Sequence, residues 1–221
     1  SDLRQYRNSC MLSIMTRDYL KLSSLEENLS SISHLADLCI QASYNHSVFI
    51  ESKNHGTPFG NNNRISDLLV IAMGKLGGHE LNPSSDVDLI FIHTVNGHTI
   101  PTNPKQKSIE NSLFFSKVVK RMSNLLGLDT NDGYVFKVDL RLRPHGNFGP
   151  LSISMDALKK YFFSNAQDWE RFAWIKSRVI NSSFHQQASE FTKISEEFNS
   201  LKDKFIYKPY LDFESVGSLR S

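Results

Sequence analysis

Two short apolar segments in the middle of the chain limit what it can fold into more than any other feature. Residues 68–73 are apolar and end at Gly74, and residues 86–93 place two aspartates ahead of an apolar run. Short apolar runs that are bounded by glycine, proline or serine are typical of strands buried on both faces. We therefore expect a central sheet.

The segments before and after these strands have the spacing of helices. Residues 3–22 and 25–46 carry apolar side chains at helical intervals, and Ser24 with Glu27 has the spacing of a capping box. Four more helices are expected after the first two strands, over residues 108–127, 155–164, 168–180 and 185–204.

A third strand is expected over residues 134–143, where apolar side chains alternate with the others. A period of two places Asp139 on the face that also carries three cations. Residues 51–64 and 94–107 are rich in polar residues, glycine and proline, which predicts loops.

Length and composition favour one domain with a helical extension. The chain has 221 residues, of which 39% are hydrophobic, enough for a core. The elements predict an α+β fold with a mixed central sheet. The expected organisation is an amino-terminal helical segment with a connecting loop (residues 1–64), a core (65–154) and a helical region (155–221).

Other counts exclude several classes of protein. No run approaches the roughly 20 apolar residues of a membrane-spanning helix. Cys10 and Cys39 lack Cys-x-x-Cys spacing, which excludes a thiolate zinc site and a disulfide scaffold and favours a reducing compartment. A net charge of +2 is too small to argue for nucleic acid. Since the chain starts at Ser1 without a signal segment, we expect a cytoplasmic protein, and we expect more chain beyond Ser221.

The first candidate site is the Asp-x-Asp at the start of the second strand. Asp86 and Asp88 share a face, with Cα atoms about 7 Å apart at a rise of about 3.3 Å per residue. Two carboxylates this close repel unless a cation lies between them, and Mg²⁺ accepts such ligands together with substrate phosphates. A strand that simply begins in solvent has the same pattern, and an EF-hand is excluded because apolar residues follow.

A glycine-rich segment precedes these aspartates. Gly74-Lys75-Leu76-Gly77-Gly78 lets backbone amides approach a phosphate while a lysine neutralises it. The segment is neither a Walker A loop nor a Rossmann fingerprint. Taken alone, it is also compatible with a plain turn between two strands.

Asp139 is a third acid, on a separate strand. Residues 137–178 contain eight basic and four acidic residues, so a cationic face lies beside the acidic one. That arrangement suits a polyanion held through metal, although an edge strand with a solvated charged face is an alternative. A glycine turn, an acid-x-acid strand and a lone later acid resemble the polymerase-β-like nucleotidyltransferase fold. There, two divalent ions about 3.5–4 Å apart stabilise in-line displacement at phosphorus.

Longer sequence segments make the resemblance more specific. They resemble segments of the glutamine synthetase adenylyltransferases. The segments are residues 73–82 with 84–91, residues 132–144 with 149–151, and residues 168–178. This family has two nucleotidyltransferase domains. Residues 143–151, 168–171, and 210–213 ahead of 218–220 resemble the amino-terminal one, which removes AMP from a tyrosine of glutamine synthetase by phosphorolysis and releases ADP. His145 departs from the family pattern, so it receives no role.

The resemblance implies a role for each site residue. Asp86, Asp88 and Asp139 would bind Mg²⁺ and act in catalysis. The expected nucleotide- and phosphate-binding residues are Gly74, Lys75, Gly77, Gly78, Ser85, Arg141 and Arg143, with the amides of Gly77 and Gly78 on phosphate oxygens. Implied partners are glutamine synthetase, a PII-type signal protein, ATP or ADP, and phosphate, without nucleic acid or membrane.

Two alternatives stay open. One is the ATP-dependent adenylylating half of the same enzyme, and the other is a non-catalytic domain that binds nucleotide or a PII-type protein. Trp169 and Trp174 are expected in the core. His93 is expected to be structural or exposed, and Lys176 and Arg178 lie either near phosphate or on a solvated helix face.

Overall fold

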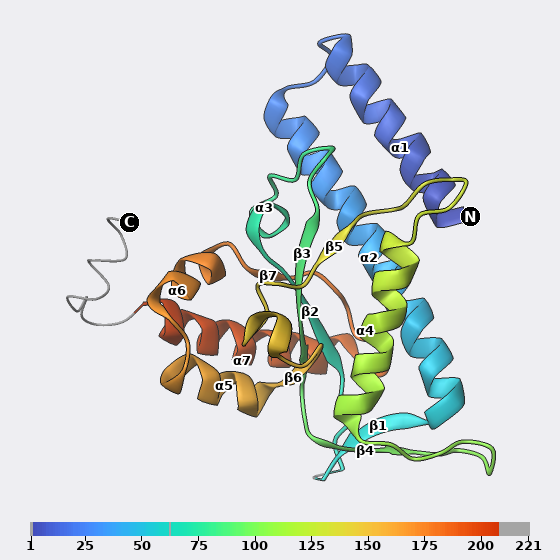
Figure 1. Cartoon of the computed structure of the whole chain (residues 1–221), viewed down its shortest axis with the longest axis vertical. Helices are drawn as coiled ribbons and strands as arrows, with labels where there is room; N and C mark the ends of the chain where they lie inside the picture. Colours follow the sequence, from blue (N-terminus) through green and yellow to red (C-terminus); the bar gives the residue numbers. More distant parts are fainter. Residues whose placement is uncertain (1, 62, 208–221) are drawn as a thin grey trace.

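The computed structural model describes residues 2–61 and 63–207. It is an α+β structure in which one sheet lies between two helical layers (Figure 1). The helices are α1 (Asp2–Tyr19), α2 (Leu25–His55), α3 (Gly74–Gly77), α4 (Asn111–Gly127), α5 (Met155–Ser164), α6 (Asp168–Ile175) and α7 (Ala188–Ile206), with a 3₁₀ turn over Gly146–Phe148. The strands are β1 (Thr57–Gly60), β2 (Leu68–Ala72), β3 (Val87–His93), β4 (Gly97–Ile100), β5 (Val138–Asp139), β6 (Ile153–Ser154) and β7 (Arg178–Val179).

The main sheet has the order β5-β3-β2-β7, and β6 also pairs with β3. The prediction that β2 and β3 are buried on both faces is confirmed, because alternate residues enter two different clusters. Leu68, Val70 and Ala72 pack with α2 and α4, whereas Leu69 and Ile71 pack with α5, α6 and α7. In Figure 1 the first layer lies to the right of the sheet and the second to its lower left.

The helix predictions are confirmed for α5 with its predicted bounds, and for α1, α2, α4 and α7 with shifted ends. Ser24 caps α2 as expected, since its side chain accepts a hydrogen bond from the amide of Glu27 at 3.2 Å. Among the described residues, no helix combines the length and apolar character that crossing a membrane requires.

Both expected loops contain a strand. Residues 51–64 continue α2 as far as His55 and then form β1, while residues 94–107 contain β4. The two strands pair antiparallel, from Thr57 opposite Ile100 to Gly60 opposite Gly97. Gly97 permits this pairing, because a Cβ there would lie 2.1 Å from the carbonyl oxygen of Phe59.

The long third strand predicted over residues 134–143 is wrong. Val135 and Phe136 are both buried, and both backbone amides donate to the carbonyl of Leu126, at 2.8 and 3.1 Å. This stretch therefore covers the carboxyl end of α4, and only Val138–Asp139 joins the sheet. The helix predicted over residues 168–180 is too long as well, since it ends at Ile175 and β7 follows.

Candidate active site

The sheet brings two of the predicted aspartates opposite each other. β3 and β5 run parallel, and their register places Asp88 beside Asp139. Asp86 lies just before β3 and is exposed, two residues from Asp88. The carboxylates from three separate sequence positions thus meet at one end of the sheet.

The repulsion between these carboxylates affects the acidity of Asp88. The pKa of Asp88 is raised, first because the group is partly buried and then because Asp139 and Asp86 repel its negative charge. Arg141 and Lys75 oppose this shift. Asp88 therefore lies where an additional positive charge would stabilise its ionised form.

Asp139, in contrast to Asp88, forms a direct ion pair with Arg141. Its Nε and Nη2 both donate to Oδ2 of Asp139, at 2.7 and 2.5 Å, and its backbone amide donates to Oδ1 at 2.8 Å. These hydrogen bonds hold the pKa of Asp139 below its usual value. The side chain of Arg141 is 75% exposed, against 13% for Asp139, so the pair lies at the open surface of the site.

The metal-binding role predicted for the three aspartates stays a prediction. Within the part of the chain that the structure describes, no three His, Cys, Asp or Glu side chains are arranged to hold a metal ion. Both oxygens of Asp139 accept hydrogen bonds from Arg141 in this structure. Asp88 on β3 and Asp86 just before it remain as oxygen ligands.

Gly74 makes room for the carboxylate of Asp88. Its φ is +53°, and a Cβ there would lie 2.9 Å from Oδ2 of Asp88. The amide of Met73 donates to the carbonyl of Asp88 at 2.9 Å, which ties the two segments together. A glycine is needed here for both backbone conformation and space.

The glycine-rich segment, predicted to bind phosphate through its backbone amides, is helical in the structure. The segment forms the short helix α3, in which the amide of Gly77 donates to Met73 and that of Gly78 donates to Gly74. Each of these two amides thus has a carbonyl partner in this structure, and their binding of phosphate stays a prediction. Gly77 serves close packing, since a Cβ there would lie 2.3 Å from the carbonyl oxygen of Lys176.

The remaining predicted residues divide into two groups. Lys75 is exposed, and its Nζ lies 3.2 Å from Oγ of Ser85, just ahead of Asp86. Arg143 instead donates to three carbonyls of its own loop: Leu140, Asn147 and Gly149. Its charge still lowers the pKa of Asp139 as a minor cause, but its donors brace the loop.

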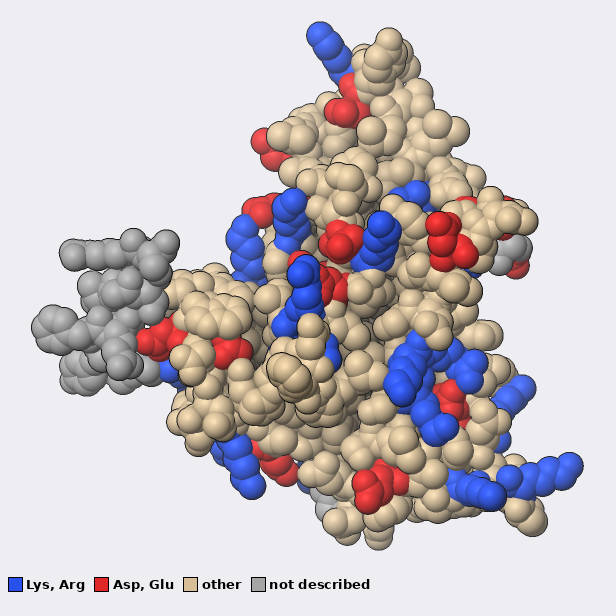
Figure 2. Space-filling view, viewed as in Figure 1, with Lys and Arg blue, Asp and Glu red and all other residues tan. Residues whose placement is uncertain are grey.

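The surface around the site carries both signs of charge. Figure 2 shows acidic side chains between several basic ones over the region of α3, β3 and β5. Such a surface can receive an anion beside carboxylates, as phosphoryl chemistry requires.

Sequence reasoning left the role of Arg178 open, and the structure assigns it to support of the glycine turn. Its guanidinium donates to the carbonyls of Leu76 and Gly77 at 3.0 and 3.2 Å. It also pairs with Asp37 of α2 at 2.9 Å. Arg178 thus holds α3 in place. Local sequence patterns do not reveal this role, because Arg178 is far in sequence from both α3 and Asp37.

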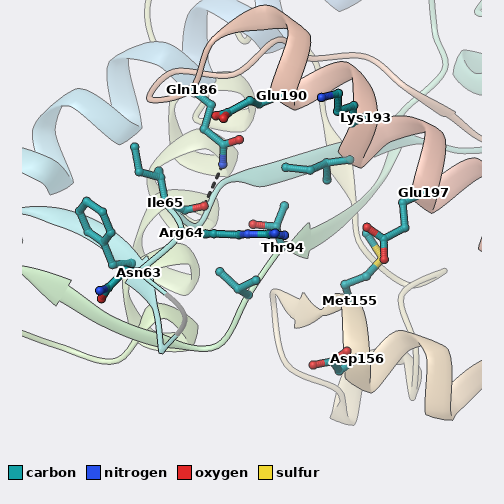
Figure 3. A pocket seen from close by; sticks show the side chains of 13 residues that line it. Asn63, Arg64, Ile65, Thr94, Met155, Asp156, Gln186, Glu190, Lys193 and Glu197 are labelled. Atoms are coloured by element: carbon teal, nitrogen blue, oxygen red, sulfur yellow. Dashed lines mark hydrogen bonds between the residues drawn. The ribbon is translucent and has the colours of Figure 1, made fainter.

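A large pocket lies at the opposite end of the sheet (Figure 3). Its volume is about 790 Å³, and Arg64, Thr94, Asp156, Glu190 and Glu197 line it. None of the predicted site residues lines this pocket. The aspartates lie instead on an open surface.

Two predictions about aromatic and histidine side chains also have outcomes. Trp174 is buried as expected, but Trp169 is 57% exposed, so its assignment to the core is wrong. His93 is buried and structural, with Nδ1 2.8 Å from Oγ of Ser152 and Nε2 3.1 Å from Oδ1 of Asn96.

Comparison with known proteins agrees with these motifs. The family described as "Glutamate-ammonia ligase adenylyltransferase" matches residues 1–193. A relative from Shewanella woodyi, named bifunctional glutamine synthetase adenylyltransferase/adenylyl-removing enzyme, is 38% identical over 99% of this chain and 22% of its own length. A relative of the same name from Nitrosomonas eutropha is 41% identical over 99% of this chain and 23% of its own length. The chain spans less than a quarter of these curated relatives, and it belongs to the glutamate-ammonia ligase adenylyltransferase family.

Proposed function

We propose that this chain is a nucleotidyltransferase that removes AMP from an adenylylated tyrosine of glutamine synthetase, by metal-dependent phosphorolysis that yields ADP. The observation that carries the proposal is the register of β3 and β5, which places Asp88 beside Asp139 next to the Gly74 turn. The names of the relatives support the substrate, and residues 143–151 and 168–171, which resemble the amino-terminal half of the family, support the deadenylylating reaction.

The fold proposal is finer than α+β. We propose a polymerase-β-like nucleotidyltransferase core over residues 65–154, after an amino-terminal helical segment and connecting loop over residues 1–64. The helical region predicted over residues 155–221 extends past Tyr207, and its last part lies outside the described residues. The antiparallel pair of β2 and β3, with acids on β3 and on its parallel neighbour β5, supports this assignment. The cytoplasmic location stays a prediction from the sequence.

The donor set fits Mg²⁺, which takes one or two carboxylates together with substrate phosphates. Asp86 and Asp88 supply these oxygens. Burial and the neighbouring acids raise the pKa of Asp88, so a bound cation would stabilise its ionised form. A bound divalent ion would withdraw charge from the phosphoryl oxygens during displacement. Asp139 becomes a third carboxylate if Arg141 turns to the phosphates, and the exposure of Arg141 supports that movement.

The residues of the chain bind and orient both reactants. Lys75 and Ser85 hold the phosphate oxygens on the open side of β3, and Arg141 offsets their charge. An oxygen of inorganic phosphate forms a bond to the phosphorus of AMP, and the bond from that phosphorus to the tyrosine oxygen breaks. The tyrosine leaves as a phenolate with a pKa near 10, so protonation by water suffices and no general acid is required.

Two assays separate this proposal from its alternatives. The chain is incubated with adenylylated glutamine synthetase, phosphate and Mg²⁺, and ADP is measured; in parallel, unmodified glutamine synthetase and ATP are scored for pyrophosphate. We expect ADP in the first assay alone. Pyrophosphate in the second would indicate the adenylylating half. Binding of Mg²⁺ and ADP or of a PII-type protein, without product in either assay, would indicate a regulatory domain.

A further inference from the structure

The loop between β5 and β6 occupies a distinctive place beside the candidate site. β5 pairs with β3 at Val87 and Asp88, whereas β6 pairs with the same edge of β3 at Ile92 and His93. These positions are about 13 Å apart along β3 at about 3.3 Å per residue. Residues 140–152 connect them, far more chain than that distance needs, so the loop projects outward next to Asp139.

The outer part of this connection, residues 143–149, is here named the Phe148 loop, and hydrogen bonds brace it firmly. Arg143 donates to Leu140 at 2.8 Å, to Asn147 at 3.1 Å and to Gly149 at 3.2 Å. The amide of Gly146 returns a hydrogen bond to the carbonyl of Arg143 at 2.8 Å. The loop is therefore closed on itself and anchored to the residue that follows Asp139.

Close packing and an aromatic contact fix the loop further. A Cβ on Gly149 would lie 2.0 Å from the carbonyl oxygen of Pro144, so the loop closes only because this residue is glycine. The ring of His145 lies edge-on to Tyr161 of α5, with 4.7 Å between centroids. His145 and Gly146 both have positive φ, at 63° and 55°. These contacts restrict the conformations open to the loop.

Phe148 ends this braced loop with its side chain fully exposed to solvent. Isolated exposed apolar side chains are common and need no explanation. Phe148 differs from the others because a preorganised loop presents it, and because that loop begins at the candidate site. A large, rigid aromatic side chain on a fixed loop is the kind of group that anchors a protein–protein contact at little entropic cost.

We propose that the Phe148 loop is a docking surface for the protein substrate, with Phe148 as the anchor that enters an apolar depression on it. This inference rests on the proposed function, because a tyrosine carried by a protein can reach Asp88 only if its surroundings touch the rim of the site. The Phe148 loop forms one side of that rim. The partner surface then needs an apolar recess close to the modified tyrosine.

The test measures binding and turnover separately. The chain and its Phe148→Ala variant are compared for affinity to adenylylated glutamine synthetase, and for turnover of a small O-adenylyl-tyrosine substrate with phosphate. Phe49→Ala is the matched control, because Phe49 is an aromatic side chain with 45% exposure on α2, next to Lys53 and away from β5. Phe148→Leu retains an apolar side chain and should restore part of the affinity.

We expect Phe148→Ala to weaken binding of the protein about tenfold and to leave turnover of the small substrate within twofold. Phe49→Ala should leave both unchanged. Protein binding within twofold of the parent chain would overturn the docking proposal, as would an equal loss of affinity for ADP, which would assign Phe148 to the nucleotide base. Absence of ADP production with the binding difference intact would instead contradict the proposed function and leave the docking surface standing.

Discussion

The two ends of β2 and β3 use buried acids in opposite ways. At one end Asp88 lies beside Asp139, repelled by its neighbours, and Asp86 is exposed. At the other end Asp67 is fully buried and accepts hydrogen bonds from the hydroxyl groups of Tyr44 and Ser183 and from the amide of Leu68. Burial raises the pKa of Asp67 as it does that of Asp88.

The difference between the two ends lies in how the acids are satisfied. Asp67 has donors on both oxygens, so its cost of burial is offset within the fold. Asp139 and Asp86 repel the charge of Asp88 more strongly than Arg141 and Lys75 attract it, so further neutralisation has to come from outside. An elevated acid pKa therefore marks a structural group at one end of the sheet and a candidate reactive group at the other.

The largest expected effect is on activity, from a change at the unsatisfied end. Asp88→Asn removes a carboxylate that we propose to hold Mg²⁺, so turnover should fall by about a thousandfold or more. Stability should stay the same or rise slightly, because repulsion from Asp86 and Asp139 disappears. ADP release and urea unfolding measure the two properties.

The control for this prediction is Asp132→Asn, an exposed carboxylate in the turn before β5. It should retain turnover within twofold of the parent chain. An Asp88→Asn variant that keeps a tenth of the parent activity would remove Asp88 from the proposed chemistry.

A change at the other end of the sheet, where Asp67 is fully hydrogen-bonded, should affect stability and not turnover. Asp67→Ala removes the acceptor of Tyr44, Ser183 and the Leu68 amide, so the free energy of unfolding should drop by about 4 kcal/mol. Tyr44→Phe is the milder test, with an expected loss of about 1–2 kcal/mol. Folded molecules of either variant should keep the parent turnover, and a specific loss of turnover would contradict the division between the two ends.

His93 makes the satisfied end sensitive to acid. Burial lowers its pKa to about 4, from an ordinary value near 6.5. Below pH 6.5 the unfolded chain binds a proton that the folded chain does not, so stability is lost as pH falls from about 6.5 to about 4. The shift corresponds to about 3 kcal/mol at about 1.4 kcal/mol per pH unit.

His93→Gln removes this group and can still hydrogen-bond Ser152 or Asn96. Its free energy of unfolding should change less between pH 7 and pH 4 than that of the parent chain. Parallel pH profiles for the two proteins would show that His93 is not the source of the acid sensitivity.

Local patterns were enough to predict β2, β3 and the five longest helices, because their apolar spacing follows directly from burial. The sequence also predicted Asp86 and Asp88 at the start of the second strand and Asp139 on a separate strand. It failed over residues 134–143, because the carbonyl of Leu126 takes the amides of Val135 and Phe136. The ion pair between Asp139 and Arg141 could not be predicted either, since a continuous strand would hold the Cα atoms of these two residues about 7 Å apart.

The end of the sheet with Asp88 also contains a fully paired side chain, that of Arg178. Its contact with Asp37 spans 141 residues of sequence. Arg178→Met removes the donors to Leu76 and Gly77 and leaves Asp37 unpaired, so unfolding should become easier by about 2 kcal/mol. Because the glycine turn then shifts relative to Asp88, turnover should fall about tenfold at saturating phosphate.

Arg171→Met is the matched control, because Arg171 also bonds a carboxylate and a carbonyl, those of Asp168 and Phe205. That variant should lose comparable stability and keep its turnover, since α6 and α7 pack there away from the aspartates. Equal turnover losses in the two variants would mean that general loosening, rather than support of α3, limits the reaction. A loss confined to Arg178→Met would show that the reactive end of the sheet depends on a satisfied ion pair behind it.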